Sequence, residues 1–270
     1  MNSSDFRAIT RDGRLKQDPT VAPDGHSLIY ALQETPALLR LMRLDLRTGR
    51  IEPLHPAANT SEYELSYAAD GSAYAFVQNR GNLSLSLVIR DANTKQDYAF
   101  TPGGGFAGLR RPAFHPDGKR IALSVPMPNG GQSIITVNRR GEDRQPLIEG
   151  AINTSPAWSP DGKSLALISS RSGTLELYLW DATTKALTLL KTPVGLKQRP
   201  TWSPDGKWIA FTINREGIYR IARIRPDGKD FAILTQESER DDYPCFLPNQ
   251  PALLYVRLLR GRTDIVQLPL

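Results

Sequence analysis

The chain has 270 residues, of which 40% are hydrophobic and 23% charged, and its formal net charge is +6 at pH 7. This length fits one large all-β domain or two ordinary domains, and no apolar run approaches the 18 residues that a membrane-spanning helix needs. The lack of such a run argues against insertion into a membrane. The basic residues are spread along the chain without a basic tail, which argues against binding to nucleic acid.

The N-terminal sequence MNSSDFRAITRDGR has no apolar segment followed by small residues at a cleavage site, so we expect no signal peptide there. The protein is therefore expected in the cytoplasm if Met1 is its native start. The chain has one cysteine, Cys245, so neither an intramolecular disulfide nor a cysteine metal cluster can form. The apolar neighbours in YPCFLP predict that Cys245 lies in the core.

A nine-residue pattern centred on Asp-Gly recurs along the chain. It reads HPDGKRIAL from residue 115, SPDGKSLAL from residue 159 and SPDGKWIAF from residue 203. Weaker copies bring the number of repeats to six, spaced by 44 to 47 residues and anchored at Asp24, Asp70, Asp117, Asp161, Asp205 and Asn249. The interval from Asn249 through the last residue and back to Asp24 is 45 residues, so the period closes on itself. Repeats of this length are typical of solenoids and propellers.

Taken in chain order, the predicted elements begin with a strand at 5–10. In each repeat a strand then leads into the Asp-Gly turn, where Asp can bond its own backbone and Gly can take the left-handed conformation. A second, alternating strand follows. The segment 37–46 alone resembles an amphipathic helix, but its place in the repeat predicts a third strand. Further third strands are expected at 86–91, 134–138, 177–181 and 218–224, and a fourth strand at 230–235.

The two ends of the chain complement each other. DFRAIT at 5–10 matches DFAILT at 230–235, the fourth strand of the fifth repeat, while DIVQL at 264–268 is a third strand without a fourth. We expect residues 5–10 to pair with 264–268 in one composite blade. This pairing would close a ring and protect an otherwise open sheet edge.

Four short strands in about 45 residues are the signature of a β-propeller. One four-stranded blade cannot bury both of its faces, whereas blades packed in a ring can. We therefore predict a single domain over residues 1–270, an all-β six-bladed β-propeller with four antiparallel strands per blade.

The segments PAWSPDGKSLA (156–166) and PTWSPDGKWIA (200–210) resemble the TolB-type repeat, a WD40-like β-propeller repeat. The resemblance extends over the whole chain. It implies a propeller and, by analogy with TolB, a non-catalytic scaffold that binds a protein or peptide. It also implies a periplasmic location if an export signal has been removed. Relatives with this repeat also include sensor domains and the gating domains of prolyl oligopeptidase-like enzymes.

The sequence shows no recognisable catalytic set. It contains no G-x-S-x-G nucleophile motif and no Walker loop, and the GGGF run at 103–106 is expected to be a loop between blades. The three histidines, His26, His55 and His115, are far apart in the predicted layout, so we expect exposed rim residues rather than a shared metal site. No cofactor, metal or catalytic residue is predicted, and the protein is expected to be a monomer.

The loops around the central channel carry Arg, Tyr and acidic residues, which suit recognition of a polypeptide. The predicted partner-binding residues lie just before first strands or within them. They are Arg110, Arg111, Arg199, Asp242, Tyr243 and Tyr63.

An alternative function remains open at this stage, namely an enzyme or small-ligand binder that works through the central channel. Some propellers are lactonases or lyases with acid–base groups in the channel, and the chain offers four carboxylates for such a role, namely Asp18, Glu62, Asp241 and Asp242. The chain could also be the sensor domain of a larger protein.

Overall fold

The computed structural model describes residues 6–79, 85–102, 109–128, 130–236 and 238–270. Every regular element in these ranges is a β-strand, which confirms the expected all-β class. The segment 37–46 contains the strand β4 (Leu38–Asp45), as its place in the repeat predicts. Within the described ranges, no helix is long and apolar enough to cross a membrane.

Four of the sheets contain four strands each, paired in chain order and antiparallel. Their strands are β2 (Lys16–Val21), β3 (Ser27–Thr35), β4 (Leu38–Asp45) and β5 (Ile51–Pro53); β6 (Ser61–Tyr67), β7 (Ala73–Asn79), β8 (Leu85–Asp91) and β9 (Asp97–Phe100); β10 (Arg110–Phe114), β11 (Arg120–Pro126), β12 (Gln132–Asn138) and β13 (Gln145–Ile148); and β14 (Asn153–Trp158), β15 (Ser164–Ser169), β16 (Glu176–Asp181) and β17 (Leu187–Leu189).

The remaining sheet has eight strands because two four-stranded groups touch. The groups are β18 (Leu196–Trp202), β19 (Ile209–Arg215), β20 (Ile218–Ile224) and β21 (Ala232–Ile233), and β22 (Arg240–Phe246), β23 (Ala252–Leu259), β24 (Arg262–Pro269) and β1 (Arg7–Ala8). One parallel register pair, Tyr219 opposite Arg240, links β20 to β22. All pairings inside the two groups are antiparallel.

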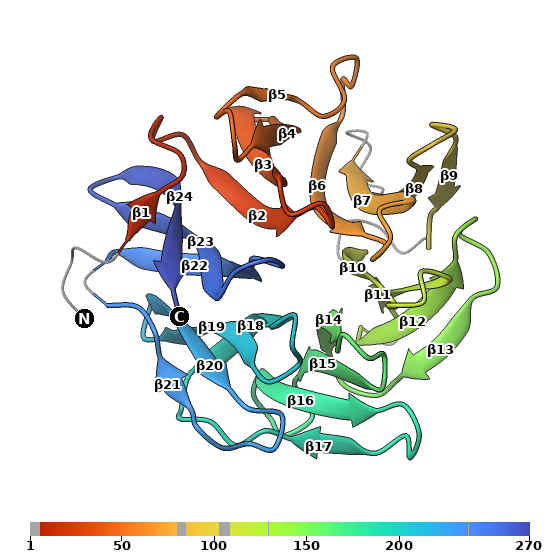
Figure 1. Ribbon diagram of the computed structural model, residues 1–270. Coiled ribbons are helices and arrows are strands. Elements are labelled where there is room, and N and C mark those ends of the chain that lie inside the picture. Colours follow the sequence, from red (N-terminus) through yellow and green to blue (C-terminus); the bar gives the residue numbers. More distant parts are fainter. Residues whose placement is uncertain (1–5, 80–84, 103–108, 129, 237) are drawn as a thin grey trace.

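The sheets are arranged around a central opening, with the first strand of each repeat nearest the centre (Figure 1). The two ends of the chain lie in the same sheet, where β1 pairs with β24 and Arg7 is opposite Gln267. The backbone N–H groups of Ile9 and Thr10 continue this contact to the carbonyl oxygen of Ile265, at 2.9 and 3.2 Å. Asp5, the first residue of the expected strand 5–10, lies outside the described residues.

The Asp-Gly pairs form the turns between first and second strands, as predicted. The glycines of the five Asp-Gly copies have φ between +68° and +71°. This left-handed conformation is unfavourable for a residue with a side chain but not for Gly. The Asp carboxylate accepts a backbone N–H two residues later. Two examples are the N–H of His26 at 2.7 Å from Asp24 Oδ1 and the N–H of Lys119 at 2.8 Å from Asp117 Oδ1.

The apolar core lies between neighbouring sheets. Leu28 of β3 shares a buried cluster with Leu254 of β23, and Ile168 of β15 shares another with Phe211 of β19. Side chains alternate along each strand, so a sheet offers one apolar face to each neighbour. Each repeat therefore completes its core only with the repeats beside it.

Thr10 provides a test of the contact between the chain ends. Its hydroxyl accepts the N–H of Ile265 at 2.9 Å and donates to Asp264 Oδ1 at 3.0 Å, and the residue is 4% exposed. Replacing Thr10 by Val keeps the shape but removes the acceptor of the Ile265 N–H, whereas Asp264 Oδ1 keeps the N–H of Gly13 at 3.2 Å. We expect Thr10→Val to lower the free energy of unfolding by about 1–3 kcal/mol in urea denaturation.

The matched control is Thr188→Val, because Thr188 lies exposed on β17. That change should alter the free energy of unfolding by no more than about 0.5 kcal/mol. Equal losses in the two variants, or no loss in Thr10→Val, would contradict a structural role for Thr10.

Candidate functional site

The first strand of every repeat contains a β-bulge at the same place. The pairing of the first and second strands skips two residues there, between Gln17 and Thr20 in the first repeat and at the equivalent positions of the others. The first skipped residue has a left-handed backbone, with φ between +49° and +58°. These six residues are Asp18, Glu64, Arg111, Ser155, Arg199 and Tyr243. Positive φ is uncommon for residues other than Gly, so its recurrence marks a shared backbone constraint.

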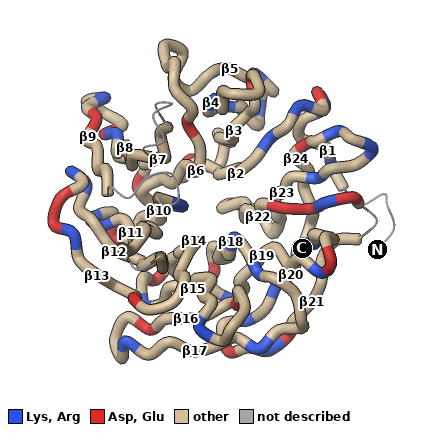
Figure 2. Tube along the Cα trace, turned by 180° about the vertical axis from the view of Figure 1, so that it is seen from behind, with Lys and Arg blue, Asp and Glu red and all other residues tan. Residues whose placement is uncertain are grey.

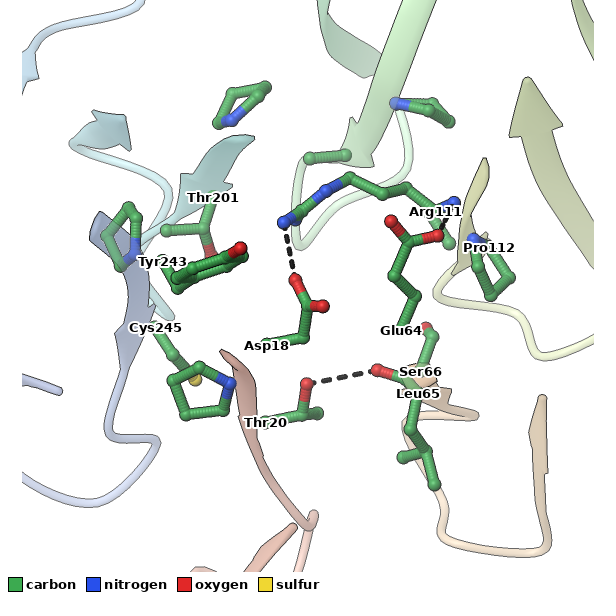
Figure 3. Close-up of a pocket in the computed structure, with 16 residues that line it drawn as sticks. Asp18, Thr20, Glu64, Leu65, Ser66, Arg111, Pro112, Thr201, Tyr243 and Cys245 are labelled. Atoms are coloured by element: carbon green, nitrogen blue, oxygen red, sulfur yellow. Dashed lines mark hydrogen bonds and ion pairs between the residues drawn. The ribbon is translucent and has the colours of Figure 1, made fainter. Parts of the chain in front are cut away.

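We call these six residues the bulge ring. The residue after each of them is Pro in five of the six repeats, which suits a bulge because Pro has no N–H to give to the sheet ladder. All six first strands contribute to a central cavity of about 190 Å³ (Figure 3). The residues that line it two positions after the bulge ring have small side chains, namely Thr20, Ser66, Ala113, Ala157, Thr201 and Cys245. The cavity is therefore narrow, and the bulge ring supplies its charged groups.

Arg111 connects two carboxylates of the bulge ring. Its Nη2 lies 2.7 Å from Asp18 Oδ1, and its backbone N–H donates to Glu64 Oε2 at 2.7 Å. Arg110 Nη1 lies 3.6 Å from Glu64 Oε1, and the Arg110 guanidinium lies 5.7 Å from the ring centre of Tyr63. The side chains of Asp18 and Glu64 are each only 9% exposed, so these charges interact in a largely dry environment.

Burial raises the pKa of Asp18 to about 6, although the Arg111 guanidinium opposes the rise. The negative charge of Glu64 raises the pKa of Asp18 further. Burial likewise raises the pKa of the Tyr243 hydroxyl to about 12, so this group is neutral at physiological pH. We call the end of the central cavity that the bulge ring surrounds the channel mouth. It holds a carboxyl group, that of Asp18, whose charge changes near pH 6 because removal from water disfavours the ionised form.

Arg199 is the centre of a second cluster on the other side of the mouth. Its Nη1 lies 3.0 and 3.1 Å from the two carboxylate oxygens of Asp242, and its guanidinium stacks 4.1 Å from the ring centre of Tyr243. Asp242 also accepts the Thr212 hydroxyl at 2.8 Å and lies 2.5 Å from Arg240 Nη2. Asp242 is 1% exposed, and this many charge-assisted bonds hold both Arg199 and Tyr243 in fixed positions.

All six residues predicted for partner binding lie at this end of the channel. Arg111, Arg199 and Tyr243 belong to the bulge ring, and Tyr63, Arg110 and Asp242 directly precede ring residues. They form the two clusters just described, which meet where the Arg111 guanidinium lies 6.0 Å from the Tyr243 ring centre.

Sequence reasoning missed part of the ring. Glu64 and Ser155 were not among the predicted residues, and Asp18 was proposed only as a channel carboxylate. Every ring residue lies six positions before its repeat anchor. When the six repeats are aligned on their anchors, this single position identifies the complete ring from the sequence.

A second column, two residues before the bulge ring, is buried between repeats. Its members are Lys16, Glu62, Leu109, Asn153, Lys197 and Asp241, none more than 3% exposed. Lys197 Nζ lies 2.6 Å from Glu176 Oε2 of the preceding repeat, and Lys16 Nζ donates to the carbonyl oxygen of Thr263 at 3.1 Å. We call these six residues the buried column. Most of its polar members tie a first strand to the repeat before it.

The buried column corrects three predictions. Glu62 and Asp241, proposed as channel carboxylates, instead bond to His55 at 2.6 Å and to Arg257 at 2.9 Å and do not line the central cavity. His55 was expected on the exposed rim. It is only 8% exposed, and its Nε2 lies 2.9 Å from the hydroxyl of Tyr74. The contact between Glu62 and His55 crosses the boundary between the first two repeats, whereas Asp241 pairs with Arg257 of the adjacent strand in its own repeat.

The remaining predictions concern Cys245, metals and one loop. Cys245 lines the central cavity and is partly exposed, and burial raises the pKa of its thiol to about 11. Among the residues that the structure describes, no three His, Cys, Asp or Glu side chains are grouped so that they could hold a metal ion. The GGGF loop at 103–106 lies outside the described residues.

Comparison with known proteins identifies relatives of the fold. The family model described as the TolB beta propeller domain matches residues 64–269. The Tol-Pal system protein TolB of Ruthia magnifica subsp. Calyptogena magnifica is 34% identical over 125 residues, which cover 44% of this chain and 28% of that protein. The match therefore spans little more than a quarter of the length of this curated relative.

Several solved structures share the fold. TolB from Acinetobacter baumannii has a TM-score of 0.72 and 23% identity, over 91% of this chain and 64% of that chain. An oligogalacturonate lyase in complex with manganese has a TM-score of 0.63 and 12% identity, over 98% and 93%. The β-propeller domain of the trilobed protease from Pyrococcus furiosus has a TM-score of 0.62 and 10% identity, over 94% and 95%. At these identities the likeness shows the fold alone.

The raised pKa of Asp18 predicts a stability change with a definite sign. The folded protein binds this proton more tightly than the unfolded chain, so the free energy of unfolding falls as pH rises from about 4 to about 6. We expect this fall, of about 2 kcal/mol, to be absent from Asp18→Asn. Urea denaturation of both proteins across this pH range measures the difference.

Asp45→Asn is a control of opposite sign. Backbone N–H groups of Thr48 and Arg47 hold the pKa of Asp45 below its usual value. The stability that Asp45 contributes is therefore lost as pH falls below about 4. If Asp18→Asn followed the wild-type pH profile between pH 4 and 6, the assigned environment of Asp18 would be wrong.

Proposed function

Because the chain belongs to the TolB beta propeller family, we propose that it is a non-catalytic scaffold that binds a protein or peptide at the channel mouth. The observation that carries this proposal is the bulge ring, which presents charged, aromatic and hydroxyl side chains around one opening. Arg and Tyr are the residues most often found at the energetic centre of protein interfaces.

The rigidity of the mouth supports this proposal. The Arg199–Asp242–Tyr243 cluster is held by several hydrogen bonds before any partner arrives. A partner would therefore lose little side-chain freedom from this surface when it binds. Preorganised aromatic and guanidinium groups of this kind favour recognition of a polypeptide.

Reachable charges also surround the mouth. Arg110 is 44% exposed and Arg240 is 39% exposed at their side chains. Figure 2 shows basic residues spread around all the sheets, with a basic segment at the start of β10 near the centre. The cavity below, at about 190 Å³, is too small for a folded domain. The partner would lie across the mouth and insert one side chain at most.

We further propose that the scaffold is one six-bladed domain over residues 1–270. The eight-stranded sheet divides naturally at the single parallel pair between Tyr219 and Arg240, which gives six four-stranded groups in register with the six sequence repeats. The pairing of β1 with β24 would then fasten the first and last segments into one blade. A closed ring of this kind needs no second copy to cover a sheet edge, so we propose a monomer.

The identity of the curated relative favours a protein partner. That relative is named as a component of the Tol-Pal system, and we propose an equivalent role in a protein assembly, in the periplasm if an export signal precedes this segment. The lyase-like alternative makes a different prediction. Only a channel-centred metal enzyme would combine a higher melting temperature in manganese with turnover of a small substrate.

The proposal is tested by photo-crosslinking from the channel mouth. A photoreactive amino acid replaces Arg110 in one protein and Lys163, an exposed residue of the Asp161 turn at the opposite end of the strands, in another. We expect position 110 to crosslink one specific protein from the source cells. Arg110→Ala should then weaken binding of the purified partner by about tenfold or more in calorimetry.

Position 163 is the control and should give no specific crosslink. Equal crosslinking from both positions, or a partner whose affinity is unaffected by Arg110→Ala, would exclude the channel mouth as the binding surface.

A further inference from the structure

A second pocket lies between the fifth and sixth repeats, at the end of the strands opposite the channel mouth. It has a volume of about 360 Å³ and is formed by the Asp205 turn, the Asn249 turn and strand β20. Trp208, Phe246 and Pro251 contribute to its apolar walls, and Arg223 is the one cationic side chain among the described residues that line it. We call it the Trp208 pocket.

Asp205 also lines this pocket, but none of the ion pairs among the described residues joins it to Arg223. The Arg223 guanidinium stacks 4.1 Å from the ring centre of Trp208, and Arg225 lies 4.8 Å from the same ring. Arg225 pairs with Asp230 at 2.5 Å. In contrast, Arg223 Nε is buried without a hydrogen-bond partner among the described residues, and none of their ion pairs includes Arg223. An unpaired buried donor of a charged group is costly, so this arrangement points to an anion supplied from outside.

The other repeats show that the fold does not require this arrangement. The residue three positions after the repeat anchor is Trp208 here and Ser27, Ala73, Arg120, Ser164 or Ala252 elsewhere. Arg223 lies on the third strand of its repeat and pairs with Ala210 of the second strand. The residues at the equivalent third-strand position of the other repeats are Arg43, Ile89, Thr136, Leu179 and Gln267. Arg43 is paired, because its Nε donates to Ser27 Oγ at 3.3 Å. Among the residues that the structure describes, the stacked indole and the unpaired guanidinium therefore occur together only in the fifth repeat.

We propose that the Trp208 pocket binds a carboxylate joined to an apolar body. The carboxylate pairs with the Arg223 guanidinium, whose plane is fixed by stacking on Trp208. The apolar body packs against Phe246 and Pro251. The pocket volume lies at the small end of the range for ligand sites, about 300–1,000 Å³, so it accommodates an acid of amino-acid size. A free small acid and the C-terminal residue of a polypeptide share this chemistry.

The test follows the indole resonance of Trp208 in two-dimensional NMR of the full chain, assigned with Trp208→Phe. The probes are N-acetyl-phenylalanine and its amide, which differ only in the carboxylate. We expect the acid to shift the Trp208 resonance and the amide to bind at least about tenfold more weakly. A third probe, 3-phenylpropionate, separates the two sources. Equal affinity favours a free acid, and weaker affinity than that of the acetylated amino acid favours a chain terminus.

Arg223→Gln tests the proposed ion pair. The sixth repeat carries Gln267 at this place, so the sheet accommodates Gln, and thermal unfolding verifies that the variant is folded. We expect Arg223→Gln to weaken binding of the acid by about tenfold or more. The matched control, Arg43→Gln, removes the equivalent Arg of the first repeat and should leave binding unchanged.

Three results would overturn the proposal. These are equal affinity for the acid and the amide, unchanged affinity in folded Arg223→Gln, or no shift of the Trp208 resonance by any acid at roughly 10 mM. The pocket is separate from the channel mouth, so each of these outcomes leaves the test at Arg110 unaffected.

Discussion

Each first strand has to accommodate one residue with positive φ, and this backbone constraint decides which side chains reach the centre of the molecule. A bulge sets two residues against one on the neighbouring strand and redirects a side chain. The unpaired N–H groups need other acceptors, and carboxylates supply them at two positions. Glu64 accepts the N–H of Arg111, and Asp242 accepts the N–H of Tyr243. The same carboxylates bind the guanidinium groups at the mouth, so backbone geometry and site electrostatics depend on each other.

Local sequence signals were sufficient to predict the all-β class and the four-stranded sheets. The Asp-Gly turns and alternating strands are local patterns, and their recurrence at a nearly constant spacing makes the repeat visible in the sequence. The bulge also had a signal, the Pro that follows it in five repeats, but its consequence for side-chain direction is not evident from composition. The column containing Asp18 was therefore only partly recognised.

Contacts between repeats were harder to predict. His55 was predicted to be exposed on the rim because it follows a short outer strand, but it is buried against Glu62 and Tyr74. Glu62 and Asp241 were predicted to be channel carboxylates because each lies only two residues before a member of the bulge ring. Which neighbour a buried polar side chain contacts depends on how two adjacent strands or sheets pack in three dimensions. No periodicity within one repeat contains that information.

The buried column has a consequence for the evolution of this chain. The turn sequences of the repeats are nearly interchangeable, but the buried groups at their boundaries are not. Lys197 needs the carboxylate of Glu176, and Glu62 needs the imidazole of His55. Moving or duplicating one of these repeats would leave a charged member of such a pair buried without its partner. Breaking a buried pair in this way costs about 3–5 kcal/mol. The order of the repeats is therefore constrained where such a pair crosses a boundary, as it does between the first and second and between the fourth and fifth repeats.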